Sequence, residues 1–225
     1  MERSMEMTSK LRPAPLETSG GCGGAVGLFG GSFDPLHIGH LALCDYLLAY
    51  PEQSGLEQVW FLPTPQNPLK ETSTAFSYEL RCELIERAIQ SDDRYRLCNI
   101  ESLLPSPHYT LETITAMQEY YPDCAFSLII GADSLASLSQ WYRYQELVAQ
   151  VPLVVYPRRG HDLSQLASRY PTAQIRIMSE APQIEVSSTA IRQAIREERD
   201  LRHWLPLPEL YDTLTLTSDH PAQYD

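Results

Sequence analysis

Short apolar runs alternate along this chain with longer amphipathic segments. Four to eight apolar residues between turn residues are typical of buried strands, and apolar positions repeating every three or four residues are typical of helices. We predict strands at 25–30, 57–62, 95–100, 125–130, 151–156 and 174–178. We predict helices at 39–49, 77–90, 110–120, 141–149 and 162–169, and a last helical part from 188 to 216. Alternating strands and helices indicate an α/β fold with a doubly wound parallel sheet.

The chain divides into three parts by composition. Residues 1–24 are rich in Met, Glu, Ser, Pro and Gly, a composition that buries too little apolar surface to offset the entropy of ordering. We therefore predict a flexible leader at 1–24. We expect an α/β core at 25–186 and a small helical part at 187–225 packed on the same domain, since 225 residues correspond to one or at most two domains.

Composition and charge exclude some classes of partner. The chain is 43% hydrophobic and has 29 acidic against 17 basic residues, a net charge of −12. This balance argues against a duplex-DNA binder, and the lack of a basic stripe with interleaved aromatics argues against an RNA-binding module. It does not exclude an anionic small molecule, because such a site needs only a local positive field.

Two further features bear on location and redox chemistry. No apolar run approaches the roughly 18 residues of a membrane span, and the first twenty residues lack the apolar centre of a secretory signal. We expect a cytoplasmic protein without a membrane partner. The five cysteines are scattered and form no Cys-x-x-Cys pair, so we predict reduced thiols and no zinc or redox site.

The segment GGSFDPLHIGH, residues 30–40, follows the first predicted strand directly. Ligands bind at the carboxyl ends of strands in open parallel sheets, and the N-terminus of the next helix attracts phosphate. Glycines let the backbone approach a ligand, and His37 and His40 lie near one face of a helix start. These features predict a nucleotide-phosphate site. A pair of capping or partly buried histidines is the alternative, and a metal pair is weaker because no third ligand is near.

A second candidate anion site lies near the C-terminus. Small hydroxyl residues at 187–189 precede an Ile-x-x-x-Ile stripe, which predicts a helix N-cap, and Arg192 lies one turn along. Such an arginine can stabilise charge on a phosphoryl group or a departing pyrophosphate. Taken alone, the segment is more typical of an ordinary cap with a solvated arginine.

Together these segments resemble the motifs of the H-x-G-H nucleotidyltransferase superfamily. His37-Ile38-Gly39-His40 is one motif, and Val186 to Arg192 is similar to the I-S-S-T-x-I-R signature of its adenylyltransferases. Class I aminoacyl-tRNA synthetases share the first motif, but they are normally much longer and carry a KMSKS-like loop, whereas this chain has only Lys10 and Lys70. The resemblance implies a Rossmann-like fold in which the two ends of the chain meet.

The middle of the chain resembles bacterial nicotinate-mononucleotide adenylyltransferases, and the resemblance extends from Val26 to Leu214. The stretches that carry it are GLFGGSFDPLHIGH, PHYTLET, LIIGADSL, QWYRYQEL and EVSSTAIR. Phosphopantetheine adenylyltransferase shares both phosphate motifs but is usually shorter and lacks the G-A-D and W-Y pairs in this form. An enzyme like it stays the alternative.

The residues of this middle part suit a nucleotide with a carboxylated ring. Tyr109 and Thr110 begin a predicted helix whose amides can receive a carboxylate. Trp141 can stack on a pyridine ring, or be a core aromatic. Gly131 and Asp133 follow a strand, where the glycine permits close approach and the carboxylate can accept from a ribose hydroxyl or cap the next helix.

The resemblance implies two sets of binding residues. The ATP set is Gly30, Gly31, Ser32, Phe33, His37, His40, Gly131, Asp133, Arg158, Ser188, Thr189 and Arg192. The nicotinate-mononucleotide set is Ser32, Phe33, Lys70, Tyr109, Thr110 and Trp141. The expected catalytic residues are His40, at the α-phosphate of ATP, together with His37, Arg192 and Lys70, which neutralise the phosphates.

The chain departs from the family pattern at two places. Leu69 stands where the P-P-H-[KR] loop of the family has its histidine, which leaves Lys70 with more of the phosphate contact. Arg158-Arg159-Gly160 replaces R-P-G and keeps the first arginine.

The implied reaction is adenylyl transfer from ATP to nicotinate mononucleotide, giving deamido-NAD and pyrophosphate in NAD biosynthesis. In-line transfer of this kind needs positioning and charge neutralisation, so we expect no covalent intermediate. Mg²⁺ is expected to arrive with ATP and keep most of its waters, so no protein metal site is predicted. A non-catalytic nucleotide-binding sensor is the alternative of another class, against which the intact motifs weigh. The sequence leaves a homo-oligomer open.

Overall fold

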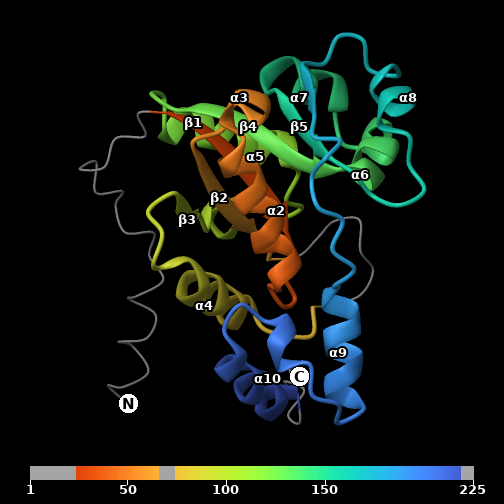
Figure 1. Ribbon diagram of the computed structural model, residues 1–225. Helices are drawn as coiled ribbons and strands as arrows, with labels where there is room; N and C mark the ends of the chain where they lie inside the picture. Colours follow the sequence, from red (N-terminus) through yellow and green to blue (C-terminus); the bar gives the residue numbers. More distant parts are fainter. Residues whose placement is uncertain (1–23, 66–73, 219–225) are drawn as a thin grey trace, which may run out of the picture.

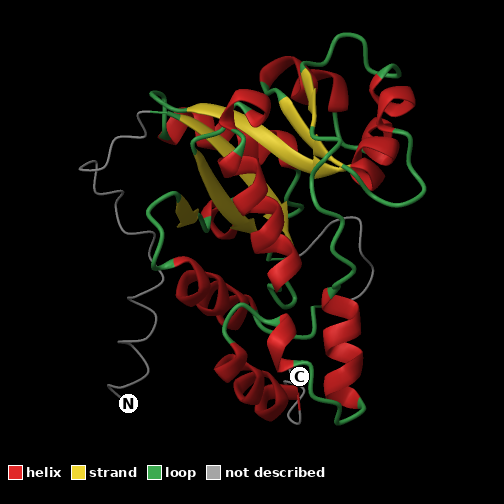
Figure 2. Ribbon diagram, viewed as in Figure 1, coloured by secondary structure: helices red, strands yellow, loops and turns green. Residues whose placement is uncertain are grey.

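In the computed structural model, residues 24–65 and 74–218 are described. Six parallel strands form one sheet in the order β3-β2-β1-β4-β5-β6 (Figures 1 and 2). The strands are β1 (Ala25–Gly31), β2 (Gln58–Pro63), β3 (Tyr95–Leu97), β4 (Ala125–Gly131), β5 (Leu153–Tyr156) and β6 (Ile175–Ile177). The predicted doubly wound parallel sheet is confirmed. The leader, apart from Gly24, and the predicted site residue Lys70 with its neighbour Leu69 lie outside the described residues.

Helices cover both faces of the sheet. The helices of the described chain are α2 (Ile38–Ala49), α3 (Pro51–Ser54), α4 (Tyr78–Ile89), α5 (Thr110–Tyr120), α6 (Ala132–Ser137), α7 (Tyr144–Gln150), α8 (Leu163–Ala167), α9 (Ser188–Arg196) and α10 (Tyr211–Ser218), of which α9 and α10 lie away from the sheet. Successive strand residues point to opposite faces. Val26 and Leu28 of β1 therefore pack with α5, α6, α7 and α8, and Phe29 packs with α2 and α4.

A third apolar cluster joins the C-terminal helices to α4. Phe76 and Leu84 pack against Ile191 and Ile195 of α9 and against Leu214 of α10. Helix α4 thus buries one side against the sheet and the other against the C-terminal part, and Figure 1 shows α9 and α10 beyond α4, away from the sheet.

Several predicted boundaries were wrong for local reasons. The strand predicted at 95–100 ends at Leu97, because the chain turns into the 3-10 helix Ile100–Leu103 (η1). The helix predicted at 141–149 begins at Tyr144, since Arg143 before it has a left-handed backbone, φ +48°. The last helical part is broken after Arg196, where Glu198 has a positive φ of 54°.

The cysteines follow the prediction in part. Cys44, Cys82 and Cys98 are buried free thiols. Cys124 is disulfide-bonded, so the expectation of a reduced thiol is wrong there. A disulfide depends on folding bringing two sulfur atoms together, which the spacing of scattered cysteines does not reveal.

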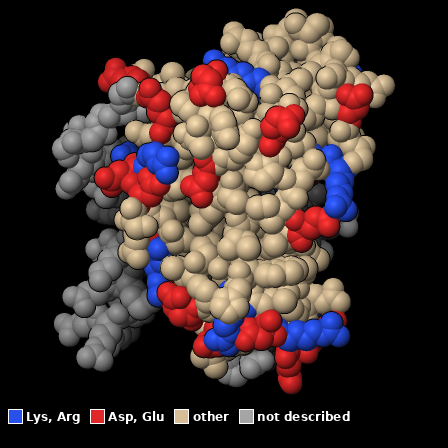
Figure 3. Space-filling model, viewed as in Figure 1, with Lys and Arg blue, Asp and Glu red and all other residues tan. Residues whose placement is uncertain are grey.

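The exterior carries charges of both signs. On the face shown in Figure 3, basic side chains lie beside acidic ones and form no continuous stripe. Within residues 24–65 and 74–218, none of the helices has the length and apolar character needed to cross a membrane.

The strand order reverses between β1 and β4. The connections that follow these two strands turn to opposite faces of the sheet, and a crevice opens outside the carboxyl ends of the strands. Gly30, Gly31 and Gly131 end the two strands at this point. The candidate site lies here.

Candidate active site

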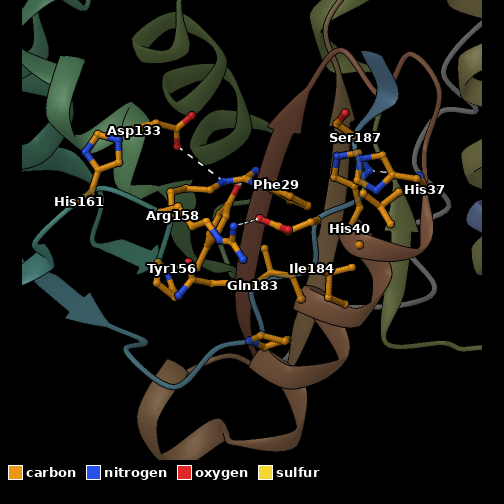
Figure 4. Close-up of a pocket in the computed structure, with 17 residues that line it drawn as sticks. Phe29, His37, His40, Asp133, Tyr156, Arg158, His161, Gln183, Ile184 and Ser187 are labelled. Carbon is orange, nitrogen blue, oxygen red and sulfur yellow. Dashed lines mark hydrogen bonds and ion pairs between the residues drawn. The ribbon is translucent and has the colours of Figure 1, made fainter. Parts of the chain in front are cut away.

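Two cavities lie side by side at the carboxyl ends of β1 and β4. The first, here called the histidine cavity, measures about 450 Å³ and is lined by His37, His40, Asp133, Arg158 and His161 (Figure 4). The second, here called the aromatic cavity, measures about 670 Å³ and is lined by residues that include Tyr109, Thr110, Trp141 and Tyr142. Phe29 and Tyr156 line both cavities, so they form a shared wall.

The two histidines at the start of α2 form a fixed pair. Their rings stack with centroids 3.7 Å apart and an interplanar angle of 18°. The backbone N–H of His37 donates to His40 Nδ1 at 3.2 Å, so the neutral ring of His40 carries its proton on Nε2. Phe29 and Phe33 pack edge-on against the His40 ring, with centroids 5.9 and 5.1 Å away. His40 is therefore held as a hydrogen-bond donor.

Burial keeps both histidines neutral. It lowers the pKa of His37 to about 4, and the nearby positive charge of Arg158 adds to this effect. Burial, then His37, then Arg158 lower the pKa of His40 well below its usual range. Near pH 7 both imidazoles are therefore neutral hydrogen-bonding groups, and an entering polyphosphate would draw their pKa values upward again.

The low pKa of His37 predicts acid-sensitive folding. The unfolded chain takes up this proton near pH 6.5 and the folded chain only near pH 4, so acid favours unfolding across that window. Between pH 7 and 5 we expect His37 to cost about 2 kcal/mol of unfolding free energy. In urea titrations at both pH values, His37→Gln should lose that much less stability than the wild type.

A matched control for this prediction is His203→Gln, at an exposed position. If His37→Gln lost as much stability between pH 7 and 5 as the wild type does, the low pKa assigned to His37 would be contradicted.

The two glycines that end β1 and the aromatic residue that follows them differ in how they relate to the two cavities. Gly30 and Gly31 line the aromatic cavity rather than the histidine cavity. Phe33 has a left-handed backbone, φ +44°, and is buried behind His40. A Cβ on Gly31 would lie 3.2 Å from the Phe33 ring. Ser32 and Phe33 line neither cavity, so their substrate contacts remain predictions.

The two motifs from opposite ends of the chain meet directly. Ser188 Oγ donates to the carbonyl of Pro35 at 2.8 Å, and Arg192 Nη1 donates to the carbonyl of Asp34 at 2.6 Å. Arg192 also pairs with the Asp34 carboxylate at 3.5 Å and donates to Thr189 Oγ1 at 3.2 Å. Of this segment, Val186 and the cap Ser187 line the histidine cavity, while Ser188, Thr189 and Arg192 do not. Their expected phosphate contacts stay predictions.

Arg158 and Asp133 line the histidine cavity together. Arg158 Nε lies 3.8 Å from Asp133 Oδ1, and Arg158 Nη2 donates to the Tyr156 hydroxyl at 3.2 Å. Figure 4 shows the pair with His161 on one side of the cavity and the two histidines with Ser187 on the other. Gly131 lines the aromatic cavity, and a Cβ there would lie 2.3 Å from Asp133 Oδ1.

The aromatic cavity brings together three of the six residues predicted for the acceptor nucleotide. Tyr109 and Thr110 lie at the start of α5. Trp141 lies in the segment between η2 (Leu138–Gln140) and α7 and lines the same cavity. Trp141 also packs on the main core, as the alternative expected, and its stacking on a pyridine ring stays a prediction. The Tyr142 ring stacks on Tyr109 at 4.3 Å and 19°, which extends the aromatic lining.

Sequence reasoning missed four residues around the cavities. They are Arg81, Glu101, Tyr142 and His161. Arg81 is fully buried and donates to backbone carbonyls of Phe76, Ser32, Thr64 and Pro65. A charged residue among the apolar positions of the predicted helix 77–90 was the only available signal for it.

Comparisons with known proteins show the family of this chain. Residues 28–194 match the cytidylyltransferase-like family. A probable nicotinate-nucleotide adenylyltransferase of Porphyromonas gingivalis is 49% identical over 84% of this chain and 93% of its own length. A protein of Bacteroides fragilis with the same description is 38% identical over 86% of this chain and 92% of its own.

Solved structures show the same fold at low sequence identity. The nicotinic acid mononucleotide adenylyltransferase of Plasmodium falciparum complexed with NaAD has a TM-score of 0.67 and 16% identity, covering 89% of this chain and all of that one. The same enzyme complexed with APC has a TM-score of 0.64 and 15% identity, covering 87% and 96%.

Proposed function

Since the chain belongs to the cytidylyltransferase-like family and to its nicotinate-nucleotide adenylyltransferases, we propose that it joins the AMP moiety of ATP to nicotinate mononucleotide. The products are deamido-NAD and pyrophosphate. ATP occupies the histidine cavity, and nicotinate mononucleotide occupies the aromatic cavity. The observation that supports this proposal most directly is that the two cavities are neighbours and share Phe29 and Tyr156 in their linings, so that substrates in them would have their reacting ends close together near His40.

The phosphates of ATP fit the residues around the start of α2. The Nε2–H of His40 donates to the α-phosphate, where charge rearranges during in-line attack, and His37 supports the His40 ring. Arg158 supplies positive charge to the same cavity. Asp133 accepts from a ribose hydroxyl of ATP. Arg192 holds the loop at Asp34 and Pro35 in place from the outside, together with Ser188.

Nicotinate mononucleotide fits the aromatic cavity. The free amides at the start of α5 receive the nicotinate carboxylate near Tyr109 and Thr110, and Trp141 stacks on the pyridine ring. Its phosphate then points toward Gly30 and Gly31, which line the same cavity near the shared wall. A Cβ at Gly30 would meet nothing within 4 Å, so the backbone there is open to a ligand.

Mg²⁺ belongs to the substrate as Mg·ATP in this proposal. The carboxylates near the histidine cavity have other partners: Asp133 pairs with Arg158, Glu185 with Arg159, and Asp34 with Arg192. Among the described residues, no group of three or more His, Cys, Asp or Glu is placed to hold a metal ion. In this proposal the phosphate oxygens of ATP and waters supply most of the ligands of the ion.

The proposal is tested by pyrophosphate release from Mg·ATP with three acceptors in parallel. We expect fast release with nicotinate mononucleotide and slow or no release with nicotinamide mononucleotide and phosphopantetheine. Release only with phosphopantetheine would overturn the acceptor and keep the phosphate site. Binding of ATP without pyrophosphate release in the presence of any of the three acceptors would favour a nucleotide sensor.

A further inference from the structure

Glu101 is a buried carboxyl inside the aromatic cavity. It lies on η1, it is 7% exposed, and its side chain contributes to the cavity lining. Its Oε1 accepts a hydrogen bond from Thr113 Oγ1 of α5 at 3.1 Å. Its Oε2 is buried and has no hydrogen-bond partner within the described part of the chain. Because an unpaired buried carboxylate oxygen is costly, this atom points to a donor from outside the chain.

Contacts place Glu101 between the two ends of the proposed acceptor site. Thr113, its partner on α5, also donates to the carbonyl of Tyr109 at 3.3 Å, at the pyridine end. On the other side is Thr64, whose side-chain hydrogen bond to the Glu101 carboxyl helps to lower the pKa of Glu101 and still leaves Oε2 without a partner in the described part of the chain. The N–H of Thr64 donates to the carbonyl of Gly31 at 2.9 Å, at the phosphate end. The ribose joins pyridine to phosphate, so in the proposed placement of the acceptor it passes close to Glu101.

The chemistry of the acceptor selects its partner. At neutral pH the carboxylate, phosphate and pyridinium of nicotinate mononucleotide donate no hydrogen bond, and its ribose hydroxyls are its donors. We propose that Glu101 Oε2 accepts a hydrogen bond from a ribose hydroxyl of the acceptor nucleotide, an assignment that rests on the function proposed above. Burial raises the pKa of Glu101 to about 7. A hydroxyl donor opposes this effect, because it stabilises the ionised carboxyl.

The test compares Glu101→Leu with the wild type on nicotinate mononucleotide and on its 2′-deoxy and 3′-deoxy forms. In the wild type, loss of the bonded hydroxyl should lower kcat/KM about 10- to 100-fold. Glu101→Leu should lose a similar factor on the full substrate and almost nothing more on that deoxy form, since the two changes remove one interaction. The KM for ATP should not change.

Two further variants keep the result interpretable. Glu119→Leu removes a carboxylate from an exposed position of α5 and should behave as the wild type. Glu101→Gln keeps the side-chain shape and an oxygen for Thr113, and should show the same non-additivity if Glu101→Leu does not fold. If the losses in kcat/KM from the Glu101 variant and from each deoxy substrate multiplied independently, the assignment of Glu101 would be overturned and the proposed function would stand. A wild type that does not use nicotinate mononucleotide would overturn the proposed function and this assignment with it.

Discussion

His40→Ala is expected to lower kcat about 10²- to 10³-fold, which is the usual cost of removing one preorganised donor from a developing charge. Near pH 7 the ring is neutral and its Nδ1 is engaged by the His37 N–H, so its contribution is the Nε2 proton. That contact strengthens in the transition state, so the KM for ATP should change far less than kcat. Pyrophosphate release under saturating Mg·ATP measures the effect.

Two comparisons separate this role from packing. The His40 ring packs against Phe29 and Phe33, so alanine also leaves a gap, and thermal unfolding must show that the variant is folded. His40→Gln restores a side-chain N–H and should recover part of the lost rate. Wild-type turnover by a folded His40→Ala variant would falsify the assigned role.

The sequence predicted the fold well because the signals for it are local. The cores of β1, β2 and β4 are nearly continuous apolar runs, so these strands were predicted within a residue or two. The short helices α3 and α6 were missed, since a single turn of helix carries no periodicity.

The candidate site was predictable only where a motif carried it. His37 and His40 line one cavity and Tyr109 and Trp141 the other, and the substrate contacts that their motifs implied stay predictions. Glu101 gave no signal, because its importance depends on an unpaired atom inside a cavity that exists only in the folded chain.

Arg81 is a second residue that the sequence did not reveal, and its partners explain why. The guanidinium donates to carbonyls of Phe76, Ser32, Thr64 and Pro65, and backbone acceptors have no residue signature. These bonds join α4 to the loops after β1 and β2. The charge is buried, and burial lowers the pKa of Arg81 without removing its proton.

Arg81→Met is expected to lower the unfolding free energy by about 3–5 kcal/mol. The substitution relieves the desolvation of a buried cation, but it leaves four carbonyls short of donors at about 1 kcal/mol or more each, and the second effect is larger. Urea unfolding measures the loss. Arg87→Met is the matched control on the same helix, because Arg87 is exposed and its 3.7 Å pair with Glu83 is solvated, so it should cost within about 0.5 kcal/mol. Equal stability of the two variants would show that the carbonyls find other donors, and that Arg81 does not hold the loops.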